Sequence, residues 1–192
     1  MPLAPLSVPA ATPDQPARER ILWTAYALFY RHGVRATGVD RVIGESGVTK
    51  VTLYRHFPSK NDLVEAFLAE RHARWMEWFD AALHRHGDGL HALAPALAEW
   101  LGDEDFRGCA FLNSTAELGD TVPAVAALTR QHKQDMAARI ARLLPPSPAR
   151  DMHAQMLALA VDGAIVHAQF GSTPQAALQA LGHAVALVER AV

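Results

Sequence analysis

The chain has 192 residues, of which half are hydrophobic and 20% are charged, and its mean hydropathy is +0.01. These values are ordinary for a soluble folded protein and exclude a chain that is fibrous or disordered throughout. No apolar run approaches the ~20 residues of a membrane helix, and the N-terminal segment lacks the basic start of a signal peptide, so we expect a cytoplasmic protein with no membrane contact. Its one cysteine, Cys109, excludes an internal disulfide and fits a reducing compartment.

The net charge of −2 is unevenly distributed along the chain. Residues 1–60 contain eight Lys and Arg against four Asp and Glu, a balance of +4, whereas the rest contains ten against sixteen, a balance of −6. Because phosphates attract cations, this asymmetry predicts a nucleic-acid footprint on the first third of the chain.

The chain begins with a proline-rich arm and a helix. Residues 1–13 contain four prolines, no Lys or Arg and no periodicity, so we expect a disordered arm that does not read DNA. From Asp14 to His32 the apolar residues recur at helical spacing, and Gly33 supplies a terminator. This helix should form the small core of a three-helix domain.

Two short helices joined by a glycine turn are predicted between Thr37 and Lys60. Thr37 is the expected N-cap of the first, and Gly47 ends it, because glycine adopts the left-handed conformation without a Cβ penalty. Thr49 is the expected N-cap of the second helix, which spans residues 50–57.

This second helix has an inward and an outward side. Leu53 and Phe57 lie four residues apart and face the core. The outward residues suit phosphates and base edges, and they are Lys50, Val51, Thr52, Tyr54, Arg55 and His56. Pro58 stops the helix, Ser59 caps the next one, and Lys60 stands at its N-terminus, where backbone N–H groups favour an anion.

The run from Gly47 to Lys60, GVTKVTLYRHFPSK, resembles the helix-turn-helix of the tetracycline-repressor (TetR/AcrR) family of transcriptional regulators. The resemblance implies an all-α protein with an N-terminal three-helix DNA-binding domain and a C-terminal helical domain for effector binding and dimerisation. Val51 and Ile43 depart from the small residues that are usual in the family. The positions that commonly meet phosphates match Thr37, Thr49, Thr52, Tyr54, His56 and Lys60. The positions that vary or lie nearer base edges match Lys50, Val51 and Arg55.

The remainder is also predicted to be helical. Periodicity and terminators indicate helices at residues 62–86, 90–101, 123–144, 151–170 and 174–192. Pro95 either lies in the opening turn of its helix or forces a kink. Residues 108–118 resemble, less specifically, a run in the regulatory domain of a TetR subgroup. The last two helices are apolar on more than one face, so we expect a second copy to cover them in a four-helix dimer seam.

We therefore expect a DNA-binding domain at residues 14–60 and an effector-binding and dimerisation domain at residues 61–192. A single short reading helix contacts few base pairs. A homodimer on a palindromic operator in double-stranded DNA is the expected arrangement.

The family resemblance also implies a small apolar or aromatic effector in the second domain. The candidate ligand-binding residues are Trp75, Trp78, Phe79, Trp100, Phe111, Asn113, Glu117, His132, His167 and Phe170. An ordinary aromatic core is the alternative for these residues. Asp162 lies among apolar neighbours and needs a partner if it is buried; a cross-dimer hydrogen bond or an arginine is the expected one.

No cofactor, metal site or enzymatic activity is expected. His84, His86 and His91 lie close together without the spacing of a structural zinc site, and Cys109 has only Arg107 as a positive neighbour in sequence. No phosphate-binding loop or catalytic motif occurs. The sequence thus predicts a transcriptional regulator, a repressor released from its operator by the effector. Two alternatives stay open: a regulator without an effector, and one that responds to redox state or metal through Cys109 or the histidines.

Overall fold

The computed structural model describes residues 11–171 and 173–192. Within these ranges the chain forms nine α-helices, one short 3-10 helix and no β-strand, which confirms the all-α class. Residues 1–10, which make up most of the predicted arm, lie outside the described residues. None of the helices in these ranges combines the length and apolar character that crossing a membrane requires.

The described chain packs into two compact units. One contains the residues up to 73 together with residues 110–129, and the other contains residues 74–109 and everything from residue 130 onward. The first unit holds α1 (Ala17–His32), α2 (Val39–Ser46), α3 (Lys50–His56), the first part of α4 (Lys60–Arg85), α6 (Ala110–Leu118) and the start of α7 (Pro123–Ala141). The second unit holds the rest of α4 and α7, η1 (Leu90–Ala92), α5 (Leu93–Leu101), α8 (Arg150–Phe170) and α9 (Gln175–Glu189).

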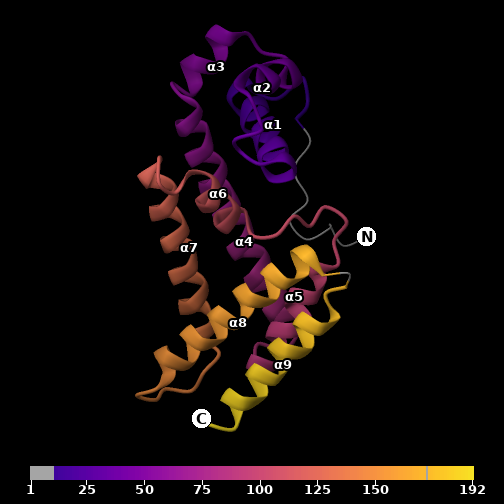
Figure 1. The fold of residues 1–192 in the computed structure, drawn as a ribbon, viewed down its shortest axis with the longest axis vertical. Coiled ribbons are helices and arrows are strands. Elements are labelled where there is room, and N and C mark those ends of the chain that lie inside the picture. Colours follow the sequence, from indigo (N-terminus) through magenta and orange to yellow (C-terminus); the bar gives the residue numbers. More distant parts are fainter. Residues whose placement is uncertain (1–10, 172) are drawn as a thin grey trace. The chain divides into compact units, whose positions relative to one another are not determined.

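In the first unit α1 packs against both α2 and α3 (Figure 1). The buried apolar side chains of this core include Ile21, Ala25, Tyr26, Phe29, Val42, Leu53, Phe57 and Phe67. The α4 residue Phe67 meets two α1 rings edge-on, with centroid separations of 5.2 Å to Tyr26 and 5.7 Å to Phe29. The buried guanidinium of Arg71 lies 4.2 Å from the centre of the Tyr30 ring and donates a hydrogen bond to the Tyr26 hydroxyl. Aromatic packing and a cation–π contact thus fix the start of α4 on α1.

The first helix of the predicted pair begins later than expected. It starts at Val39 with Gly38 as its N-cap and has no side-chain cap, so the prediction of Thr37 as the N-cap was wrong. The Thr37 side chain is completely buried, and its hydroxyl donates to the carbonyl oxygen of Gly33 at 2.7 Å. The hydroxyl therefore closes the α1–α2 connection instead of opening α2.

The predicted terminator of α2 and the predicted side-chain caps of α3 and α4 are confirmed. Gly47 ends α2 in the left-handed region with φ = 64°. The Thr49 hydroxyl caps α3 by accepting a hydrogen bond from the Thr52 N–H at 3.2 Å, and the Ser59 hydroxyl accepts one from the Asp62 N–H at 3.2 Å. These local bonds set the angle at which α3 leaves α2 and α4 leaves α3.

In the second unit α5, α8 and α9 pack on one another (Figure 1). Pro95 is the third residue of α5, in the opening turn where a missing N–H removes no helical hydrogen bond, so the helix accommodates it without a break. The buried sides of α8 and α9 carry Ala154, Leu157, Val161, Ile165, Leu181, Val185 and Val188. Both helices also present an outward side with exposed apolar residues, among them Leu159 and Leu187.

Candidate functional site

The outward face of α3 gathers the predicted DNA-contact residues. Lys50, Val51, Tyr54 and Arg55 are exposed, while Leu53 on the opposite side is completely buried. Thr52 and His56 flank this face and are half-buried, and the exposed Thr49 hydroxyl lies 2.9 Å from that of Thr52. A helix that is fixed on one side and offers basic and hydroxyl groups on the other can be placed in a major groove.

Val51 is the most exposed large apolar side chain in the described part of the chain. It is 78% exposed at the centre of the α3 face. An isopropyl group cannot accept or donate a hydrogen bond, but it can make an apolar contact with the methyl group of thymine in the major groove. This departure from the family's small residue therefore has chemistry suited to base recognition.

Two of the residues predicted to contact phosphate, Thr37 and Lys60, are buried or half-buried. The buried Thr37 side chain does not reach the α3 face. Lys60, the first residue of α4, is half-buried, and its Nζ donates to the carbonyl oxygen of Val34 at 2.6 Å. Burial lowers the pKa of the Lys60 ammonium, while the negative charge of Glu117 acts in the opposite direction. An ammonium has three donors, so Lys60 can hold Val34 and still bind an anion.

Five of the predicted effector-binding residues form one aromatic cluster in the second unit. The Trp75 ring lies at its centre, stacked on Phe79 at a centroid distance of 4.7 Å and edge-on to His132 at 4.9 Å. Trp78 and Trp100 meet Trp75 at 5.7 Å and 6.1 Å. Phe106 extends the cluster through Trp100 at 5.2 Å, and sequence reasoning missed it because it lies outside any helix.

The cluster contains a polar group that its surroundings do not satisfy. The indole N–H of Trp78 is buried and has no hydrogen-bond partner among the described residues. Leaving a buried donor without a protein or water partner costs about 1–3 kcal/mol. A ligand with a hydrogen-bond acceptor would satisfy it.

The other five effector candidates lie on α6 and α8. Phe111 on α6 is buried and meets His72 edge-on at 6.5 Å. Asn113 lies half-buried on the same helix, and the Glu117 carboxylate binds the backbone of Arg35 in the first unit. On α8, His167 and Phe170 contact each other at 4.9 Å, and both are exposed.

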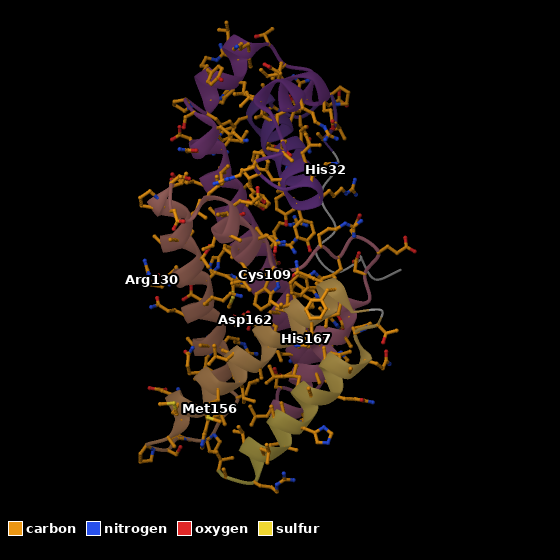
Figure 2. The ribbon with its side chains drawn as sticks, in the orientation of Figure 1. His32, Cys109, Arg130, Met156, Asp162 and His167 are labelled. Atoms are coloured by element: carbon orange, nitrogen blue, oxygen red, sulfur yellow. The ribbon has the colours of Figure 1, made fainter. Side chains whose placement is uncertain are left out.

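Cys109 and Asp162 are joined by a residue that sequence reasoning missed. Lys133 Nζ on α7 donates to Asp162 Oδ1 at 2.5 Å and lies 3.4 Å from Cys109 Sγ (Figure 2 labels Cys109 and Asp162). The Asp162 partner is therefore a lysine of the same chain rather than the expected arginine or partner subunit. Burial alone would lower the pKa of Lys133, but the neighbouring Cys109 and Asp162 outweigh it, so that pKa lies above its ordinary value.

The histidines near the end of α4 bind carboxylates. His84 Nδ1 lies 2.7 Å from Asp88 Oδ2, and His86 Nε2 lies 2.8 Å from Glu99 Oε1. Burial disfavours the charged form of Glu99, yet hydrogen bonds and charge from Arg85 and His86 hold the pKa of its carboxyl below the usual range. No group of three His, Cys, Asp or Glu side chains in the described ranges is placed to hold a metal ion.

The fold and the α3 face together define a helix-turn-helix DNA-binding protein. Comparison with known proteins specifies the family. The sequence profile described as "Bacterial regulatory proteins, tetR family" matches residues 21–67. The chain is 31% identical to SCO4454, a TetR-family transcriptional regulator from Streptomyces coelicolor, with a TM-score of 0.81 over 92% of this chain and 95% of that one. The chain belongs to the TetR family of transcriptional regulators.

Two further proteins are similar to this chain. A TetR transcriptional regulator from Chloroflexus aurantiacus shares the fold with a TM-score of 0.77 and 23% identity, over 91% of this chain and 94% of that one. The transcriptional repressor KstR2 of Mycolicibacterium smegmatis is 35% identical over 69 residues, which span 35% of this chain and 32% of that protein. The chain thus matches only about a third of that curated relative's length. Members of this family bind DNA, dimerise and are not enzymes.

Proposed function

We propose that this protein is a homodimeric repressor that binds a palindromic operator through α3 and is released by a small aromatic or apolar effector. The exposed basic and hydroxyl-bearing face of α3 is the observation that carries the proposal. A repressor is among the relatives that this chain resembles. Because its target is bacterial DNA, the protein acts in the cytoplasm.

An exposed apolar stripe on α8 supports dimerisation through the last two helices. Its members alternate in steps of four and three residues, and they are Met152, Met156, Leu159, Gly163, Val166 and Phe170. Leu159 is 63% exposed and Phe170 is 71% exposed, although large apolar groups normally avoid water. A 4-3 spacing is the seam of paired helices, and in a two-fold dimer the same stripe meets its own copy.

The outward side of α9 carries small residues that complement the large side chains of the α8 stripe. Along one side of α9 and just beyond its end, the exposed or half-buried residues at helical spacing are mostly small, and they are Ala176, Ala180, Ala184, Leu187 and Ala191. An apolar hollow between α8 and α9 is lined by His153, Met156, Leu157, Ala184, Leu187, Val188 and Ala191. Large side chains on one helix and small ones on the other allow two copies to interdigitate.

The aromatic cluster around Trp75 supports an effector of matching chemistry. Flat rings stack on Trp and Phe faces, and the unpaired Trp78 N–H selects a molecule that also carries a hydrogen-bond acceptor. An aromatic ketone, phenol or carboxylate carries both a flat ring and a hydrogen-bond acceptor.

α4 provides a covalent route from the effector cluster to the reading helix. It is one continuous helix from Lys60 to Arg85, with Lys60 directly after α3 and Trp75, Trp78 and Phe79 toward its other end. An effector that binds one orientation of α4 more tightly increases the population of that orientation. The two α3 helices of the dimer then no longer have the spacing that matches successive major grooves.

The test begins with a duplex selected by the protein from a random-sequence library. We expect the selected site to be palindromic, the protein to elute as a dimer, and a member of an aromatic compound panel to raise its melting temperature while weakening DNA binding. Trp78→Phe should bind the same compound more weakly and bind DNA as before. Selection of no common sequence contradicts operator binding, whereas a compound that binds without changing DNA affinity contradicts effector release.

A further inference from the structure

The connection between α1 and α2 is bound by a carboxylate from α6. The Oε2 atom of Glu117 accepts a hydrogen bond from the backbone N–H of Arg35 at 2.6 Å. The Oε1 atom lies so close to Gly33 that a Cβ there would be 2.8 Å away, and Gly33 has φ = 85°. The backbone bends toward the carboxylate in a conformation that glycine adopts without strain. Glu117 lies 82 positions from Arg35, so this contact belongs to the tertiary structure.

The same connection is bound by an ammonium from α4. Lys60 Nζ donates to the carbonyl oxygen of Val34, the residue between Gly33 and Arg35, at 2.6 Å. The negative charge of Glu117 favours the charged form of Lys60 and opposes the effect of burial. Residues 33–35 are thus held by an acid on α6 and a base on α4, and all of these residues belong to one compact unit.

We propose that Glu117 is a positioning residue for DNA binding: it fixes the Gly33–Arg35 connection so that Lys60 is held at the N-terminus of α4 beside the reading helix. This inference rests on the proposed phosphate contact of Lys60. Glu117 does not touch DNA. It keeps the carbonyl of Val34 in place, and Val34 in turn orients the ammonium, which leaves the remaining donors of Lys60 for a phosphate oxygen. A displacement of α6 that withdraws Glu117 would loosen Lys60 without altering α3.

Two substitutions separate the hydrogen bond from the charge. Glu117→Gln keeps an oxygen that can accept the Arg35 N–H, whereas Glu117→Ala removes it. Affinity for the duplex selected by the wild-type protein should fall roughly tenfold in Glu117→Ala, the size of a lost hydrogen bond to a charged group, and much less in Glu117→Gln. Asp120→Ala and Asp120→Asn are matched controls, because Asp120 is an exposed acid just beyond the end of α6. Both controls should bind as the wild type does.

A double-mutant cycle distinguishes positioning of Lys60 from a general structural effect. If Glu117 acts through Lys60, Glu117→Ala should cause no further loss in a Lys60→Ala background. Additive losses, or Glu117→Ala binding as well as the wild type, overturn the inference. Thermal unfolding of each variant shows whether a loss of affinity reflects unfolded protein. Lys60→Ala with wild-type affinity instead refutes the phosphate contact itself, so the two failures can be told apart.

Discussion

Lys133 on α7 and Asp162 on α8 form an ion pair in which each side chain is only about one-fifth exposed, at 20% and 21%. The two residues are 29 positions apart in the sequence, and Cys109 lies on the other side of the ammonium. Because both side chains are largely buried, removing one of them leaves the charge of the other poorly solvated. Its loss should therefore be measurable.

Asp162→Asn should lower the free energy of unfolding by about 1–3 kcal/mol at pH 7. Removing one member of a fully buried pair costs about 3–5 kcal/mol, and the remaining exposure of both side chains reduces this value. Urea unfolding provides the measurement. Glu77→Gln, which removes an exposed carboxylate on α4, is the control and should change stability by less than ~0.5 kcal/mol.

The stability difference between wild type and Asp162→Asn should also depend on pH. The pKa of Lys133 is raised in the folded state, so the stabilisation is complete below the pKa of an unfolded lysine, about 10.4, and is lost as pH rises through the folded value. Unfolding curves between pH 8 and pH 11.5 should show the two proteins converging at the alkaline end. A difference that stays constant across this range would contradict a contribution of Asp162, beside that of Cys109, to the raised pKa of Lys133.

Four substitutions test the DNA-contact residues. Lys60→Ala and Tyr54→Phe should weaken binding similarly for all sequences, because both residues are proposed to contact phosphates, and Lys60→Ala should reduce the slope of log affinity against log salt by about 1. Lys50→Ala and Arg55→Ala should change which sequences are preferred. Gel-shift titrations at several salt concentrations provide the data. If all four proteins bind as the wild type does, α3 is not the reading helix.

Val51 should determine the preference for thymine at one base pair of each half-site. Val51→Ala removes two methyl groups from a side chain that is 78% exposed, so its effect on folding should be small. We expect the selected duplexes to lose that preference by several-fold, because the apolar contact to the thymine methyl is weakened. Parallel selections with the wild type and the variant reveal this. Identical base frequencies at every position would remove Val51 from base recognition.

Leu159→Glu should convert the dimer into a monomer. The substitution places a carboxylate near its own copy in the centre of the α8 stripe, where desolvation and like-charge repulsion both oppose association. Analytical ultracentrifugation reports the mass, and operator affinity should fall with it. Gln175→Glu adds the same charge at an exposed position at the start of α9 and should remain dimeric. A dimeric Leu159→Glu protein would place the interface elsewhere.

The local features of the reading domain could be predicted because they depend on neighbouring residues. Gly47 ends a helix through its own backbone freedom, and Thr49 and Ser59 cap helices by binding N–H groups three residues away. Apolar spacing likewise located the long helices to within a few residues. Thr37 was assigned the wrong role because its hydroxyl has two possible partners, and packing of α1 against α2 favoured the Gly33 carbonyl.

No element was predicted for residues 108–118, where the structure has α6. This helix has nine residues, and its apolar side chains do not form a long repeating stripe, so periodicity gave no clear signal. Glu117 was predicted to bind the effector. Its actual partner, the backbone N–H of Arg35, lies 82 positions away and leaves no local signal in the sequence.

The sequence by itself determined the all-α class, the helix-turn-helix and the residues exposed on α3, since each follows from interactions within a few turns of helix. Only the tertiary structure decided which distant groups meet. Packing placed Glu117 on the α1–α2 connection, Lys133 within reach of both Cys109 and Asp162, and the Trp78 N–H in a buried site where no described residue pairs with it. Charges and hydrogen-bond donors must be neutralised or paired when they are buried, but the residue that does so is selected by the packing of helices and not by its distance along the chain.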